Sequence, residues 1–123
     1  MATPKLITVI EDYDSFRYSL RQLLEFEGYE VAEAADGEAG LALLEEITPD
    51  MILLDLTLPG IDGISTARKI RESERLHSIP IFALSAHDLP DLQSEAIAAG
   101  CNCYLTKPID FDELNKLLKD HLG

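Results

Sequence analysis

The sequence contains no uninterrupted apolar stretch close to the about 18–20 residues that a membrane-spanning helix needs, so we expect no membrane insertion. It has only two cysteines, Cys101 and Cys103, which are too few for a disulfide framework. It also shows no secretory signal, because the first apolar run leads directly to Glu11 and Asp12. These absences predict a protein of the reducing cytoplasm.

Basic residues are scarce as well. Lys and Arg number 10 against 23 Asp and Glu, which gives a formal net charge of -13. Nucleic acid and anionic lipid surfaces repel such a protein, so we expect direct binding to neither. Four of the bases lie in one segment, residues 68–75. A solvated helix face is the ordinary interpretation of this run, and a patch for an acidic partner is the alternative.

What is present is the pattern of one globular domain. With 46% hydrophobic and 27% charged residues, the chain is too apolar to be disordered, and we expect residues 1–123 to form a single domain. Apolar runs alternate five times with stretches of helical periodicity, a pattern typical of a parallel sheet with helices on both faces. The runs are residues 6–10, 30–34, 51–54, 80–84 and 103–106.

The second apolar run differs from the others, because residues 30–34 alternate polar and apolar side chains. Doubly covered strands are continuously apolar, so this run is predicted to lie at an edge of the sheet. The fold class is therefore predicted to be α/β, a flavodoxin-like, doubly wound (βα)5 domain with strand order 2-1-3-4-5.

Chemically distinctive residues follow four of these runs. Glu11 and Asp12 follow the first run, Asp55 the third, Ser85 the fourth and Lys107 the fifth. The carboxyl ends of parallel strands meet at one edge of the sheet, so these side chains are expected to converge. Because the first and third strands are neighbours in this order, the three acids should form one cluster.

Clustered carboxylates repel one another unless a cation intervenes, and hard oxygen ligands suit Mg²⁺, which readily shares a phosphate. Capping of the next helix is the alternative for Asp12. The combination predicts a phosphoryl-transfer site, because Mg²⁺, Lys107 and the Ser85 hydroxyl would stabilise the phosphoryl oxygens. Asp55, alone at the end of a central strand, is the predicted nucleophile.

The dipeptide Lys107-Pro108 adds to this prediction. A residue before proline favours extended backbone, and an X-Pro bond at a strand end can be cis. Pro108 is therefore a candidate cis-proline that would aim Lys107 over the edge of the sheet.

In combination, these residues resemble the receiver domain of two-component response regulators, over about residues 5–122. The resemblance is carried by Glu11-Asp12 and by three segments, 53–63 (LLDLTLPGIDG), 84–86 (LSA) and 104–108 (YLTKP). The departures are small: the acidic pair is Glu-Asp rather than Asp-Asp, and serine replaces the commoner threonine at position 85.

The resemblance implies that Asp55 accepts a phosphoryl group from a histidine of a sensor kinase or a phosphotransfer protein. It implies that Asp12, Asp55 and the backbone carbonyl of Thr57 bind Mg²⁺ directly, with Glu11 acting mainly through water. The protein would then be a signalling switch that catalyses only its own phosphorylation and dephosphorylation.

The resemblance also implies how such a switch is read. Ser85, Ala86 and Lys107 would contact the phosphoryl group, and Tyr104 would turn inward as Ser85 moves. The surface of the fourth helix, fifth strand and fifth helix would then bind a downstream protein that the sequence does not name. For Tyr104 alone, a strand residue with its hydroxyl in water is the alternative.

Several alternatives remain open. The chain is either a stand-alone receiver without an output domain or a receiver excised from a larger regulator or hybrid histidine kinase. A small Mg²⁺-dependent aspartyl phosphatase, similar to haloacid-dehalogenase-like enzymes, would need an acid where Thr57 stands. A degenerate receiver would not retain Asp12, Asp55, Ser85 and Lys107 together. Because no large exposed apolar patch is evident, the unphosphorylated protein is predicted to be a monomer.

Overall fold

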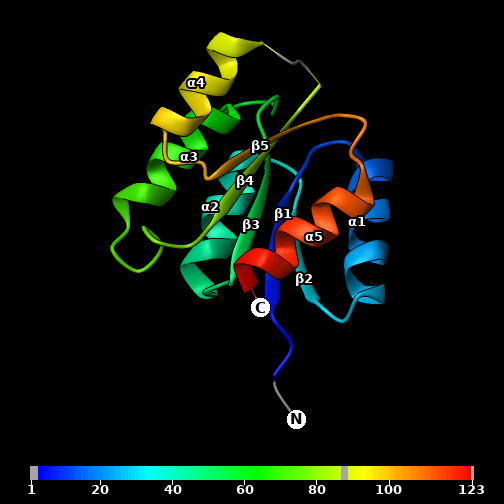
Figure 1. Ribbon diagram of the computed structural model, residues 1–123. Coiled ribbons are helices and arrows are strands. Elements are labelled where there is room, and N and C mark those ends of the chain that lie inside the picture. The colour runs from blue at the N-terminus through cyan, green and yellow to red at the C-terminus, as the bar shows by residue number, and fades with distance from the viewer. Residues whose placement is uncertain (1–2, 87–88, 123) are drawn as a thin grey trace.

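The computed structural model describes residues 3–86 and 89–122 (Figure 1), in which five strands alternate with five helices. The elements are β1 (Leu6–Ile10), α1 (Asp14–Phe26), β2 (Glu30–Ala34), α2 (Gly37–Glu46), β3 (Met51–Asp55), α3 (Gly63–Glu72), β4 (Ile81–Ser85), α4 (Pro90–Ala98), β5 (Cys103–Thr106) and α5 (Phe111–Leu122). Within the described ranges, no helix has both the length and the apolar character that crossing a bilayer requires.

The five strands form one parallel sheet in the order β2-β1-β3-β4-β5. Ile10 at the end of β1 lies opposite both Ala34 of β2 and Leu54 of β3. The predicted fold class and strand order are therefore confirmed, and the alternating segment 30–34 lies at an edge of the sheet as expected.

Local signals at the helix ends explain where the chain turns. Asp36 precedes α2, and its Oδ1 accepts a hydrogen bond from the backbone N–H of Ala39 at 2.7 Å, which satisfies one of the free donors of the first turn. Gly28 follows α1 with φ of 96°, a backbone conformation in which a Cβ would be strained. Such residues fix the short loops that return the chain to the sheet.

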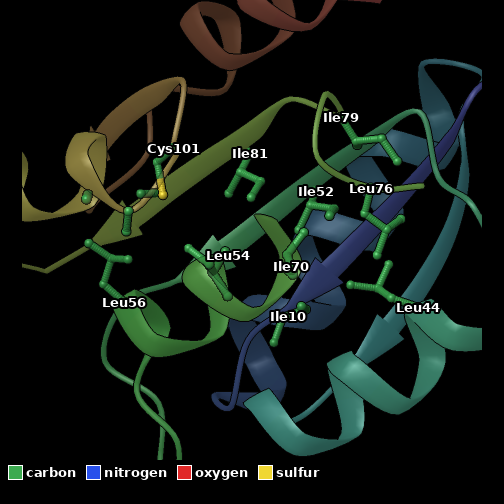
Figure 2. Close-up of a cluster of buried hydrophobic side chains, with 14 of the residues drawn as sticks. Ile10, Leu44, Ile52, Leu54, Leu56, Ile70, Leu76, Ile79, Ile81 and Cys101 are labelled. Carbon is green, nitrogen blue, oxygen red and sulfur yellow. The ribbon is translucent and has the colours of Figure 1, made fainter. Parts of the chain in front are cut away.

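Side chains of successive strand residues point to opposite faces, so the sheet separates two hydrophobic clusters. One cluster packs under α2, α3 and α4 (Figure 2), and it includes Ile10, Leu44, Ile52, Leu54, Ile70, Ile81 and Ala96. The other packs under α1 and α5, and it includes Ile7, Val9, Leu20, Leu24, Leu53, Phe82, Leu84, Leu114 and Leu118. Burial of both sheet faces leaves the strand ends as the place where polar groups gather.

The basic segment 68–75 is not one open patch. The Arg71 guanidinium donates a hydrogen bond to the carbonyl oxygen of Gly100 at 2.7 Å, beyond the end of α4. The Arg75 guanidinium donates to the carbonyl oxygen of Ile47 at 2.9 Å, beyond the end of α2. These two cations therefore stabilise loop backbone, which disfavours the interpretation of the whole segment as a patch for an acidic partner.

We expect Thr8→Val to raise the free energy of unfolding by about 1 kcal/mol in urea denaturation. Thr8 has no exposed surface in the middle of β1, and its Oγ1 has no hydrogen-bond partner among the described residues. Removal of an unpaired buried hydroxyl relieves its desolvation cost.

Thr66→Val is the matched control. Thr66 is also fully buried, but its Oγ1 donates a hydrogen bond to the carbonyl oxygen of Asp62 at 2.8 Å, so the same change should lower stability. Equal effects of the two substitutions would contradict the assignment of the Thr8 hydroxyl as unpaired.

Candidate functional site

The carboxyl ends of four neighbouring strands bring the candidate residues to one edge of the sheet. Asp55 is the last residue of β3 and Ser85 the last of β4, whereas Glu11 directly follows β1 and Lys107 directly follows β5. The backbone N–H of Lys107 donates to the carbonyl oxygen of Ser85 at 2.7 Å, which continues the pairing of β4 and β5 up to the site. Sequence-distant residues are therefore adjacent because of strand order.

The three acids form one cluster, as the strand order predicts. Glu11, Asp12 and Asp55 each offer a carboxylate oxygen, and these oxygens lie within 4.8 Å of one another. Glu11 is fully buried and Asp55 is 2% exposed, whereas Asp12 is open to solvent. The cluster is thus buried on one side and accessible on the other.

Lys107 contacts the two buried acids. Its Nζ lies 2.7 Å from Oε1 of Glu11 and 3.7 Å from Oδ2 of Asp55. The Lys107 side chain keeps 22% of its surface exposed. Its ammonium therefore neutralises Glu11 closely and Asp55 more weakly. The Lys107–Pro108 peptide bond is cis.

The acids differ in how many of their oxygens are engaged. Both oxygens of Glu11 have partners, because Oε1 meets Lys107 and Oε2 accepts the backbone N–H of Tyr13 at 2.9 Å. Asp55 uses Oδ1 to accept the backbone N–H of Thr57 at 3.0 Å. The helix-cap alternative for Asp12 is not supported, because Tyr13 is the N-cap of α1 and that end has no side-chain cap.

Burial raises the pKa of Asp55 from 3.8 to about 7, and the negative charge of Glu11 contributes to this rise. The hydrogen bond from the backbone N–H of Thr57 and the positive charge of Lys107 lower the pKa, but they do not offset the effect of burial. The ionised form of Asp55 is therefore short of compensating charge. A divalent cation between Asp12 and Asp55 would supply that charge, and a half-open group of hard carboxylate oxygens fits Mg²⁺.

The other candidate residues lie in β4, in β5 or just after β3 and β4. Thr57 is exposed and reaches Asp55 through its backbone N–H. Ser85 has no exposed surface, and Ala86 after it is exposed. Tyr104 is half-buried against the cluster under α2, α3 and α4, and it lies opposite Ala83, two residues before Ser85.

Phe16 is a residue at the site that the sequence motifs do not include, whereas Gly63 ends the motif segment 53–63. Phe16 packs against the hydrophobic cluster under α1 and α5, and its ring lies against the ammonium of Lys107, with Nζ 4.7 Å from the ring centroid. Gly63 begins α3 where a Cβ would lie 2.4 Å from the carbonyl oxygen of Asp55. The contact of Phe16 is with Lys107, near the other end of the chain, so no local spacing in the sequence points to it.

Comparison with known proteins agrees with this geometry. The chain matches the sequence model of the response regulator receiver domain over residues 7–119. It is 30% identical to the polar-differentiation response regulator DivK of Brucella anthropi over 98% of both chains.

Solved structures are similar over nearly the whole chain. The chemotaxis protein CheY4 of Vibrio cholerae has a TM-score of 0.93 at 28% identity, covering 98% of this chain and 100% of that one. The receiver domain of the sensor histidine kinase PA1611 of Pseudomonas aeruginosa has a TM-score of 0.91 at 34% identity, covering 98% and 99%. That domain was crystallised with a magnesium ion coordinated in its active-site cleft.

Asp55→Asn is expected to stabilise the protein at pH 8 by on the order of 1–3 kcal/mol, with little effect at pH 4. The pKa of Asp55 is raised by folding to about 7, so between pH 4 and 7 the folded state binds more protons than the unfolded state. The free energy of unfolding therefore falls as the pH rises through this window. The uncharged amide of Asp55→Asn does not titrate, so the variant does not lose this stability.

The measurement is urea denaturation at both pH values in the presence of EDTA. Asp120→Asn, at an exposed position in α5, is the control and should leave stability nearly unchanged at either pH. An equal gain in the free energy of unfolding for Asp55→Asn at pH 4 and pH 8 would show that the pKa of Asp55 is not raised by folding.

Proposed function

Because the chain belongs to the response regulator receiver domain family, we propose that Asp55 is its phospho-acceptor in two-component signalling. The observation that carries this proposal is the placement of Asp55, 2% exposed, inside an acidic cluster and 3.7 Å from the ammonium of Lys107. The phosphoryl donor would be a phosphohistidine of a sensor histidine kinase or a histidine phosphotransfer protein.

The residues that would hold Mg²⁺ are Asp12, Asp55 and the backbone carbonyl of Thr57, with Glu11 acting mainly through water. This division is supported by the engagement of both Glu11 oxygens within the protein, whereas Asp12 is exposed at the open side of the cluster. The magnesium ion in the related PA1611 receiver domain is consistent with the same choice of metal. When bound, the ion supplies positive charge next to the phosphoryl oxygens.

The transfer itself needs a deprotonated Asp55. A carboxylate oxygen of Asp55 attacks phosphorus, the O–P bond forms, and the N–P bond to the donor imidazole breaks, with the electron pair returning to that nitrogen. Lys107 is near enough to stabilise the charge on the phosphoryl oxygens after a small movement. The Ser85 hydroxyl and the backbone N–H of Ala86 would donate to the remaining oxygens.

The response would pass through the neighbouring strand and helix. A phosphoryl group adds charge and hydrogen-bond acceptors, to which the Ser85 side chain would move. Tyr104 lies on the next strand, packed against the same cluster as α4, so its inward rotation would change the α4-β5-α5 surface that a downstream protein binds. The aspartyl phosphatase alternative finds no support, since Thr57 stands where that chemistry needs a second acid.

Intact-mass spectrometry after incubation with acetyl phosphate and Mg²⁺ tests this proposal. We expect one added phosphoryl group that hydroxylamine removes, because an acyl phosphate is a reactive anhydride. The modification should disappear in Asp55→Asn and in the presence of EDTA. The exposed-site control Asp120→Asn should be modified like the parent protein.

Lys107→Ala separates phosphorylation from the response. It should still gain the phosphoryl group, but the NMR signals of Tyr104 should no longer shift on modification, because the charge contact is lost. A mass gain that persists in Asp55→Asn, or many equivalents of phosphate released per protein from a small ester, would refute the proposed function.

A further inference from the structure

The aromatic ring of Phe16 lies against the same ammonium that contacts the acidic cluster. Lys107 Nζ is 4.7 Å from the centroid of this ring, inside the roughly 6 Å over which a cation is attracted to an aromatic face. Phe16 lies in the first turn of α1, half-buried against the cluster under α1 and α5. Its ring also lines a mainly apolar hollow together with Pro108 and Phe111.

Among the described residues, the ammonium therefore has three different neighbours. Glu11 Oε1 at 2.7 Å forms a close ion pair, Asp55 Oδ2 at 3.7 Å is a weaker contact, and the Phe16 ring is the third. The ring attracts the cation without offering a lone pair or a second negative charge. The ring therefore restrains the Lys107 side chain but leaves its N–H groups free to donate to a stronger acceptor, such as a phosphoryl group on Asp55.

We propose that Phe16 is a positioning residue for the phosphorylation site, whose ring face holds the Lys107 ammonium between Glu11 and Asp55. A phosphoryl group on Asp55 then meets a cation that is already oriented, and less ordering is needed on phosphorylation. This role rests on the proposed function of Asp55 as phospho-acceptor.

A purely structural role for Phe16 gives a different expectation. Phe16 packs against the hydrophobic cluster under α1 and α5, so in that case its volume would matter and the electron density of its ring would not. A cation on an aromatic face responds to that electron density. Substitutions that change the ring electronically, at nearly constant volume, therefore separate the two roles.

The experiment replaces Phe16 with 4-fluoro- and 3,4,5-trifluorophenylalanine in the full chain. Binding of beryllofluoride, a stable mimic of the phosphoryl group, is measured in the presence of Mg²⁺. We expect the dissociation constant to rise progressively with fluorination, by roughly twofold to fivefold in total, as expected for loss of a partly exposed cation–π contact.

Two controls isolate the contact. The same fluorinated residues at Phe111, which lines the same hollow, should leave the dissociation constant unchanged. In a Lys107→Met background, fluorination at Phe16 should also have no effect, because the cation is absent. The double-mutant cycle then assigns the whole effect of fluorination to the contact with Lys107. The free energy of unfolding of each variant verifies that the fold is retained.

A readout in the unphosphorylated protein completes the test. The ring should shift the Lys107 Cε methylene proton resonances upfield, and Phe16→Leu should abolish this shift. A flat fluorination series in a protein that binds beryllofluoride normally would overturn the positioning role alone. Failure of the parent protein to bind beryllofluoride would overturn the proposed function of Asp55 and the role of Phe16 with it.

Discussion

Two carboxylates, Glu11 and Asp55, are buried side by side at the carboxyl edge of the sheet, and the rest of the site follows from how their charges are compensated. Lys107 lies closer to Glu11, which also accepts a backbone N–H, so Glu11 is stabilised within the protein. Asp55 has the more distant contact with Lys107, and burial raises its pKa to about 7. The unequal division leaves the ionised form of Asp55 with less compensating charge than that of Glu11.

Much of this arrangement is predictable from the sequence, because strand order alone decides which strand ends meet. The cluster of Glu11, Asp12 and Asp55 needed only the pairing of β1 with β3. The unequal engagement of the acids was not predictable, since it depends on distances of 2.7 and 3.7 Å that no residue pattern encodes. Arg71 resembled a surface charge because the carbonyl oxygen that it binds lies 29 residues away along the chain.

The site also joins the two hydrophobic clusters that the sheet separates. Phe16 packs with the cluster under α1 and α5, and Tyr104 packs against the cluster under α2, α3 and α4. Each aromatic ring thus lies where a cluster approaches the strand ends, one against Lys107 and the other on the strand next to Ser85. A change of charge at Asp55 can therefore affect side-chain packing on both faces of the sheet.

The ion pair between Glu11 and Lys107 joins residues that are 96 positions apart in the sequence. During synthesis, the acids of β1 and β3 leave the ribosome well before the lysine that neutralises them. A nascent or truncated chain without β5 holds the carboxylates but lacks their internal cation, and its sheet edge stays incomplete. The acidic cluster gains its internal cation, and the sheet its last strand, only when β5 is in place, so the electrostatics of the site depend on completion of the fold.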